Sequence, residues 1–197
     1  MNKNSTIFLA GHRGLVGSEV LKILKEKKFR NIITVQRDEL DLTNSDKVEK
    51  FFHKKKIDYL IMAAAKAGGI LANSAYQKDF FFNNIEIQNN LLKLALKKKI
   101  KRTIFLGTSC IYPKFAKNPI KEDYLLTGKL EKTNQCYAIA KIAGIKLCEA
   151  LYESNNLDIV CLMPTNIYGV NDNFDKFNGH VIPAMIKKFL DAKKKKS

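Results

Sequence analysis

A tyrosine and a lysine with three residues between them, Tyr137 and Lys141, are the first candidates for chemistry in this sequence. If the segment that holds them is helical, side chains four positions apart lie on one face. The ammonium group of Lys141 can then lie near the phenol of Tyr137 and favour the phenolate. An unperturbed phenol titrates at about 10, so this help suits Tyr137 for acid–base work near neutrality. The same spacing also fits a half-buried tyrosine beside a solvated lysine, so its meaning depends on the rest of the chain.

A glycine-rich segment near the N-terminus indicates a second kind of chemistry. Gly11, Gly14 and Gly17 follow an apolar run with the spacing G-x-x-G-x-x-G. Glycines allow a tight turn and a close approach of the backbone to a pyrophosphate, and a helix that begins there offers free N–H groups. An ordinary strand–helix turn is the alternative. We interpret the segment as the phosphate loop of a dinucleotide site, with contacts from Gly11, Arg13, Gly14, Leu15, Val16 and Gly17.

The end of the second apolar run indicates which dinucleotide binds. NAD sites of this kind carry an acidic residue there to hold the ribose 2′-hydroxyl, whereas this run ends at Arg37. Arg37 can pair with a 2′-phosphate, and Arg13 is a second cation for it. The neighbouring Asp38 would repel that phosphate if it faced inward, and a surface role for Arg37 stays open, but we favour NADP(H) over NAD. Asp41 and Leu42 are predicted to contact the adenine, although a turn or capping role suits Asp41 equally well.

Short apolar runs alternate with longer amphipathic ones along the chain. The short runs are continuously apolar, as expected for strands buried on both faces of a parallel sheet. This alternation predicts an α/β fold, a Rossmann-type doubly wound parallel sheet with helices on both faces, whose ligands bind beyond the carboxyl ends of the strands. The predicted strands are Thr6–Ala10, Ile32–Val35, Tyr59–Ala64, Thr103–Leu106 and Ile159–Met163, and the predicted helices lie near 15–24, 48–52, Phe80–Leu96 and Tyr137–Tyr152.

The composition fits one globular domain. The 197 residues are 46% hydrophobic, and no apolar run approaches the ~20 residues that cross a bilayer. No signal-peptide pattern precedes the first strand, so we expect a cytoplasmic protein. The four cysteines lack paired or metal-ligand spacing, and Cys148 and Cys161 are interpreted as core residues. The net charge of +16 is spread over helix faces and turns, so we expect an anionic cofactor and substrate rather than nucleic acid or a membrane.

Several segments of the sequence resemble the GDP-L-fucose synthase family, which is of the extended short-chain dehydrogenase/reductase type. The resemblance runs from Ile7 to about Leu190 with the right spacing. AGHRG, SCIYPK and YAIAKIAGIKLCE are more specific than general dehydrogenase motifs. The segments are Ala10–Gly17, Ala63–Ile70, Gly107–Lys114, Tyr137–Cys148, Met163–Gly169 and Asn178–Pro183.

The resemblance implies an NADPH-dependent 3,5-epimerase/4-reductase that converts GDP-4-keto-6-deoxy-D-mannose to GDP-L-fucose. It gives Tyr137 and Lys141 the reductase roles. Thr108 would be the hydroxyl that orients the substrate oxygen towards Tyr137, with Ser109 as the alternative. The family more often has serine at position 108. Threonine keeps the hydroxyl and adds a methyl group, so we expect activity to persist.

For the two epimerisations, the resemblance marks Cys110 as the base and His180 as the acid. The C4 ketone acidifies the protons on C3 and C5, and a thiol and an imidazole can both titrate near neutrality when tuned. Without the resemblance, a structural role would be the better interpretation of each. His12 and His53 are interpreted as loop and surface residues.

Other site residues follow from the same resemblance. Asn166 would help to position the sugar. Lys188 would meet the GDP phosphates as a point charge, where the family often has a bidentate arginine. Lys66, after the third strand, either lines the entrance of the site or is solvated. Further cofactor contacts are expected from Lys141, Pro164, Asn166, Ile167 and His180.

The family's chain normally continues into a small substrate-binding domain, which is largely missing here. We assign residues 1–192 to one NAD(P)-binding domain with the catalytic residues and 193–197 to a disordered basic tail. We expect an exposed sheet edge with apolar surface, and a homodimer through the helices Phe80–Leu96 and Tyr137–Tyr152. Two other functions stay open: a nucleotide-sugar epimerase or dehydratase that uses NAD, and a catalytically silent dinucleotide-binding module.

Overall fold

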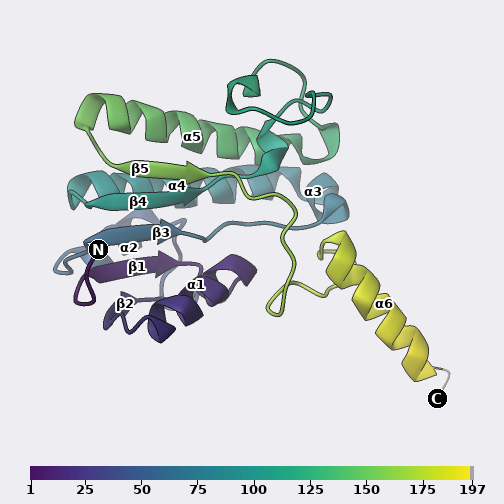
Figure 1. The fold of residues 1–197 in the computed structure, drawn as a ribbon, viewed down its shortest axis with the longest axis horizontal. Helices are drawn as coiled ribbons and strands as arrows, with labels where there is room; N and C mark the ends of the chain where they lie inside the picture. The colour runs from purple at the N-terminus through teal and green to yellow at the C-terminus, as the bar shows by residue number, and fades with distance from the viewer. Residues whose placement is uncertain (196–197) are drawn as a thin grey trace.

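The computed structural model describes residues 1–195, which form a parallel sheet with helices against both faces (Figure 1). The strands run in the order β2-β1-β3-β4-β5. They are β1 (Thr6–Ala10), β2 (Asn31–Ile33), β3 (Tyr59–Met62), β4 (Arg102–Leu106) and β5 (Ile159–Leu162). The α-helices are α1 (Leu15–Glu26), α2 (Ser45–Phe52), α3 (Ile70–Ala75), α4 (Gln77–Lys97), α5 (Gln135–Asn155) and α6 (Val181–Lys195). Short 3₁₀ helices lie between β4 and α5: η1 (Ser109–Ile111), η2 (Glu122–Tyr124) and η3 (Lys132–Asn134).

The predicted strands and helices are all present, which confirms the α/β fold class. β2 ends at Ile33 because the chain then turns: the backbone N–H of Gln36 donates to the Glu39 carboxylate, and its carbonyl accepts from Leu40. Neither α3 nor α6 is among the predicted helices. α3 is too short to show a helical period. In α6, Pro183 lies in the first turn, where its missing N–H costs no hydrogen bond.

One face of the sheet packs against a layer made by α2, α4 and α5, and the other meets α1 (Figure 1). Phe8 of β1 contacts Phe52 of α2, with ring centroids 4.5 Å apart. At Gly144 of α5, a Cβ would lie 2.5 Å from the Phe105 ring and 2.6 Å from the amide oxygen of Gln88. Only glycine therefore lets α5 lie this close to β4 and α4, which fixes the helix that carries the predicted tyrosine and lysine.

The face that meets α1 is left partly bare over β5. Val160 and Leu162 are 39% and 46% exposed there, beside Ile104 and Leu106 of β4, with which they pair. Figure 1 shows that α6 leads away from the sheet instead of covering this face. The prediction of strands buried on both faces is therefore wrong for β5, and the expected exposed sheet edge with apolar surface is present.

The C-terminal lysines differ from the predicted disordered tail. Helix α6 continues to Lys195, so that prediction is wrong from Lys193 to Lys195. Lysine is a good helix former, and its charge is favourable near a helix C-terminus. Residues 196 and 197 of the predicted tail lie outside the described part of the chain. Among residues 1–195, no helix has the length and apolar character needed to span a bilayer.

Candidate active site

The glycine segment forms a tight turn between β1 and α1. Gly11 has a φ of +85°, and a Cβ there would lie 2.5 Å from the backbone nitrogen of Ala64. A Cβ at Gly17 would overlap the carbonyl oxygen of Gly11. Gly14 is the N-cap of α1, and no side chain among the described residues caps that helix. The first-turn N–H groups, which include those of Leu15 and Val16, can therefore receive an anion.

Two predicted cofactor cations lie beside the end of β2. Arg13 Nη1 donates a hydrogen bond to Gln36 Oε1 at 2.6 Å, which ties the glycine loop to the turn after β2. The pKa of Asp41 is lowered mainly by the hydrogen bond from the backbone N–H of Thr43, with a smaller contribution from the charge of Arg37. Asp41 therefore has the turn role that the sequence left open. Arg13 and Arg37 therefore both belong to the region around the turn that follows β2.

Thr108, after the end of β4, meets Tyr137 in the first turn of α5. The Thr108 hydroxyl forms a side-chain hydrogen bond with Tyr137 and accepts another from the backbone N–H of Cys110, at 3.4 Å. Burial raises the pKa of Tyr137 to about 12, the charge of Cys110 adds to the rise, and the bond to Thr108 opposes it. The prediction of a favoured phenolate is therefore wrong for the protein without cofactor. A phenol that stays protonated at neutral pH is suited to donate a proton.

Lys141 lies in the interior beside the same strand end. It is only 4% exposed, its Nζ donates to the carbonyl oxygen of Leu106 at 2.8 Å, and its Nζ lies 5.0 Å from the ring centroid of Phe105. Burial lowers the pKa of Lys141 to about 8. The side chain therefore keeps its charge at neutral pH. Burying an ammonium costs free energy unless it is hydrogen-bonded or paired, and the Leu106 carbonyl supplies one such hydrogen bond.

This burial is expected to make the stability of the chain depend on pH through Lys141. Its pKa is about 8 in the folded chain against an ordinary 10.5. Between these pH values the unfolded chain binds more protons, so the free energy of unfolding rises with pH. At ~1.4 kcal/mol per unit of pKa, the total rise is about 3 kcal/mol. Urea unfolding of the wild type and of Lys141→Met gives the free energy of unfolding of each protein at neutral and at alkaline pH. The contribution of Lys141 appears as a change, between the two pH values, in the difference between the two proteins. A difference that stays constant would contradict the expected burial.

Cys110 lies in η1, next to the phenol. The Tyr137 pKa responds to the charge of Cys110, so the thiol and the phenol share one site. The Cys110 thiol is free and half-buried. The side-chain Nδ2 of Asn134 donates a hydrogen bond to Cys110 Sγ at 3.2 Å. Asn134 is not among the predicted site residues, and its sole signal in the sequence is its place three residues before Tyr137.

The segment after β5 crosses from the catalytic residues to the glycine loop. The backbone N–H of Ser109 donates to the carbonyl of Pro164 at 3.3 Å. Further along, the side chain of Asn171 donates to the Ser18 hydroxyl of α1 at 3.0 Å. The segment therefore runs along the carboxyl edge of the sheet. Two predicted cofactor residues lie exposed between these contacts: Asn166 and Ile167.

His180 directly precedes α6, and the residues before it dock on the loop after β3. The N–H of Gly69 donates to the carbonyl of Asn178 at 3.0 Å, and a Cβ at Gly69 would overlap the carbonyl oxygen of Gly179. This docking holds the exposed His180 at the carboxyl edge, where Figure 1 shows α6 beginning near α3. Lys188, further along α6, is exposed.

The predicted catalytic residues are thus brought together in part. Thr108, Cys110, Tyr137 and Lys141 form one cluster between the end of β4 and the start of α5. Among residues 1–195, no hydrogen bond or ion pair joins His180 to this cluster. The loop that docks the histidine segment does reach the neighbourhood of the phenol through Phe80 of α4. A Cβ at Gly68 of that loop would lie 3.2 Å from the Phe80 ring, and Phe80 packs edge-on against Tyr137 with ring centroids 6.2 Å apart.

Lys66 is anchored by local contacts and is not freely solvated. Its backbone N–H donates to Asn84 Oδ1 at 3.0 Å, and Asn84 Nδ2 donates back to its carbonyl at 2.9 Å. Its Nζ lies 3.4 Å from a carboxylate oxygen of Asp79 and 5.7 Å from the ring centroid of Phe80. Lys66 therefore lies in the corner that Phe80 shares with Tyr137.

The two remaining histidines lie where the sequence places them. His53 follows α2 and is exposed, and His12 is half-buried within the glycine loop. The Nδ1 atom of His12 is buried and has no hydrogen-bond partner among the described residues. Within the same residues, no group of three or more acidic, cysteine or histidine side chains could hold a metal ion.

The chain is similar to known proteins over nearly all of its length. Residues 7–197 match the NAD dependent epimerase/dehydratase family. GDP-L-fucose synthase 1 of Arabidopsis thaliana is 51% identical over 192 residues, which are 98% of this chain and 59% of that protein. A GDP-D-glycero-L-gluco-heptose synthase of Campylobacter jejuni, solved in the presence of NADPH, is 38% identical with a TM-score of 0.91, over 96% of this chain and 55% of that one. A GDP-L-fucose synthetase of Naegleria fowleri bound to NADP is 27% identical with a TM-score of 0.89, over 100% and 61% of the two chains.

The coverage sets the scope of these similarities. The chain spans a little under three fifths of the length of the curated plant relative, and a similar share of the solved structures. The similarity nevertheless extends over nearly all of this chain. The chain therefore belongs to the NAD dependent epimerase/dehydratase family and is a homologue of the GDP-L-fucose synthases.

Proposed function

We propose that the chain carries the cofactor-binding and catalytic part of an NADPH-dependent 3,5-epimerase/4-reductase that converts GDP-4-keto-6-deoxy-D-mannose to GDP-L-fucose. The observation that carries this proposal is the cluster of Thr108, Cys110, Tyr137 and Lys141 at the carboxyl edge of the sheet, the edge at which the uncapped glycine loop also lies. A reductase needs the phenol and its ammonium. The thiol beside them gives the site a second acid–base group, which a simple reduction does not require.

In the reduction step, the residues of the chain handle the proton. NADPH, when bound, supplies the hydride that adds to C4 of the sugar. Thr108 orients the C4 oxygen by hydrogen bonding, and Tyr137 donates its phenolic proton to that oxygen as negative charge develops on it. The high pKa of Tyr137, about 12, keeps the proton in place until then. The buried ammonium of Lys141 then stabilises the phenolate that is left.

In the epimerisation steps, Cys110 and His180 handle the protons on carbon. The C4 ketone stabilises the carbanion that forms when Cys110, as the thiolate, removes a proton from C3 or C5. His180 returns a proton to the opposite face of the same carbon, which inverts it. Cys110 already lies in the cluster, and His180 lies on an exposed segment at the same edge. We infer that the substrate bridges the two.

The experiment that tests this function mixes the purified chain with GDP-4-keto-6-deoxy-D-mannose and NADPH. The proposal expects loss of reduced nicotinamide absorbance and formation of GDP-L-fucose. An NAD-dependent epimerase or dehydratase would instead change the sugar without consuming NADPH. A silent module would bind NADPH and leave the sugar unchanged. Because the chain spans only part of its relatives, the same assay is run with the C-terminal part of a relative added.

Cofactor choice is expected to depend on Arg37. We propose that Arg37 and Arg13 hold the 2′-phosphate of NADPH, since Arg13 is fixed against the turn after β2 and Arg37 lies on that turn. Arg37→Ala should weaken NADPH binding about tenfold, or ~1.4 kcal/mol, and leave NADH binding nearly unchanged. Fluorescence titration measures both. Arg30→Ala, an exposed arginine before β2, is the control; equal NADPH affinity in the two variants would contradict the assignment.

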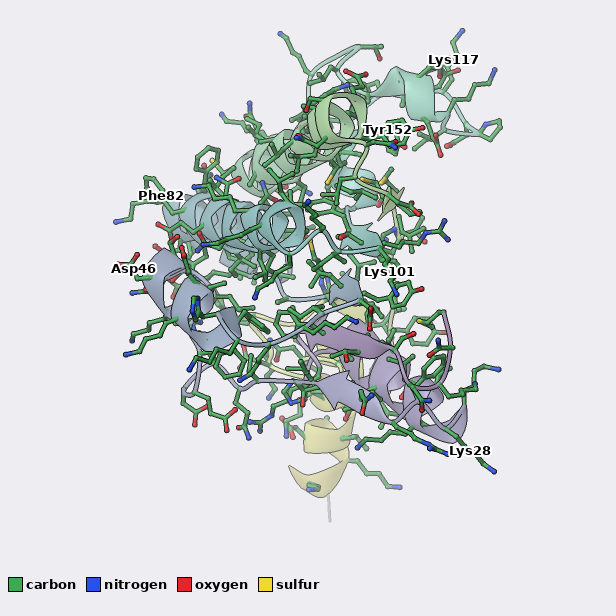
Figure 2. The ribbon with its side chains drawn as sticks, turned by 90° about the vertical axis from the view of Figure 1, so that its left-hand side faces the viewer. Lys28, Asp46, Phe82, Lys101, Lys117 and Tyr152 are labelled. Carbon is green, nitrogen blue, oxygen red and sulfur yellow. The ribbon has the colours of Figure 1, made fainter. Side chains whose placement is uncertain are left out.

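We also propose that the chain forms a homodimer through α4 and α5. Phe82 of α4 is 54% exposed and Ile139 of α5 is 39% exposed. Figure 2 shows Phe82 on the outer side of α4, away from the sheet. Apolar side chains exposed on two neighbouring helices suit a two-fold interface that closes on itself. Sedimentation equilibrium of the purified chain measures its mass in solution.

A further inference from the structure

We propose that Asn134 is a positioning residue for Cys110, and that its side-chain amide holds the sulfur and stabilises the thiolate. The contact is direct: Asn134 Nδ2 donates to Cys110 Sγ at 3.2 Å. The backbone of Cys110 is also held, because its N–H donates to the Thr108 hydroxyl. This inference rests on the proposed function where it gives Cys110 a role as base, but the hydrogen bond can be tested without any substrate.

Asn134 directly precedes helix α5, but its side chain does not cap that helix. Asn134 is the N-cap residue of α5, yet its side chain makes no capping hydrogen bond. Asparagine is favoured at N-caps because its carbonyl oxygen accepts from a free N–H of the first turn. Asn44, the N-cap of α2, does this by accepting from the N–H of Lys47 at 2.9 Å. The amide of Asn134 is turned to the thiol instead.

The oxygen of the same amide supports a role in proton transfer. Asn134 Oδ1 is buried and has no hydrogen-bond partner among the described residues. A buried polar atom without a partner costs free energy and calls for an explanation. A half-turn of the amide exchanges Nδ2 and Oδ1. The side chain can therefore donate to a thiolate and accept from a thiol, so it can serve Cys110 in both of the protonation states that a base passes through.

The position of the thiol adds a second consequence. The sulfur of Cys110 contacts Asn134, the N-cap residue of α5, and so lies near a helix end where the dipole favours negative charge. Its charge is one cause of the raised pKa of Tyr137. A thiolate that Asn134 stabilises therefore adds to the effect of burial, which is the larger cause of the raised Tyr137 pKa. In this way one amide favours the base of the epimerisation and the acid of the reduction together.

The test compares Asn134→Asp with Asn44→Asp. Aspartate has nearly the size of asparagine and caps helices equally well, but a carboxylate cannot donate to sulfur and repels a thiolate. The rate of Cys110 alkylation by iodoacetamide at neutral pH is measured by peptide mass spectrometry on the full chain, with the half-buried Cys136 as an internal reference. We expect the Cys110 rate to fall about tenfold in Asn134→Asp, the factor that corresponds to ~1.4 kcal/mol. The Cys136 rate should fall much less than the Cys110 rate, and Asn44→Asp should alkylate as the wild type does.

Equal Cys110 rates in the two variants would overturn the proposal. So would a parallel change of Cys110 and Cys136 with a lowered thermal midpoint, because that pattern reports loosening of the fold. Proton exchange at C3 and C5 of the keto-sugar separates the hypothesis that Asn134 holds Cys110 from the hypothesis that Cys110 is the base of the epimerisation. If alkylation slows and exchange is unaffected, the hydrogen bond is supported and the role of Cys110 in the proposed function fails.

Discussion

Replacement of Tyr137 by phenylalanine is expected to lower the rate of hydride transfer about a thousandfold, within the range that a general acid contributes. The ring stays in its contact with Phe80, so the fold should keep its stability. Protons on C3 and C5 should continue to exchange with solvent, because Cys110 and His180 carry out those steps in the proposed function. The measurements are the loss of nicotinamide absorbance and deuterium incorporation into the sugar.

Tyr112→Phe is the matched control for this variant. Tyr112 lies just after η1, and burial also raises its pKa, but its hydroxyl has no assigned role. It should leave hydride transfer close to the wild-type rate. If Tyr137→Phe loses proton exchange together with hydride transfer while its far-UV and near-UV circular dichroism stay native, the reduction and the epimerisations do not use separate groups.

The parts of the site that could be predicted are those fixed by local spacing. The glycine loop depends on three residues within one strand–helix turn, and its backbone at Gly11 and its crowding at Gly17 are as expected for that motif. Tyr137 and Lys141 lie on one helix, so their separation follows from helical geometry alone. The order of strands and helices follows from the alternation of apolar and amphipathic runs.

The parts that could not be predicted depend on residues far apart in the sequence. The sign of the Tyr137 pKa shift is set by burial beneath other elements, which outweighs any help from Lys141. The exposure of Val160 and Leu162 depends on whether a later segment covers β5, and α6 does not. Asn134 has the sequence of an ordinary helix cap, and only the fold of the loop after β4 brings Cys110 to its amide.

Alanine at Gly17 and alanine at Gly14 are both expected to weaken cofactor binding, but only the change at Gly17 is expected to lower stability. At Gly17, a Cβ would overlap the carbonyl oxygen of Gly11, and neither backbone can give way. Overpacking of this kind costs about 1–3 kcal/mol, so Gly17→Ala should lower the free energy of unfolding by about that amount and lose NADPH binding with it. Urea unfolding and fluorescence titration measure the two quantities.

At Gly14, the nearest atom to an added Cβ is the Gly11 carbonyl oxygen at 3.5 Å, and the φ of −77° suits any residue. Gly14→Ala should therefore change the free energy of unfolding by no more than about 0.5 kcal/mol. The methyl group would instead stand where the backbone of a phosphate loop approaches the pyrophosphate, so NADPH affinity should fall about tenfold, or ~1.4 kcal/mol. Wild-type affinity in this variant would mean that the pyrophosphate does not lie over the N-terminus of α1. A stable protein with weakened binding would show that Gly14 serves the cofactor while Gly17 serves the fold.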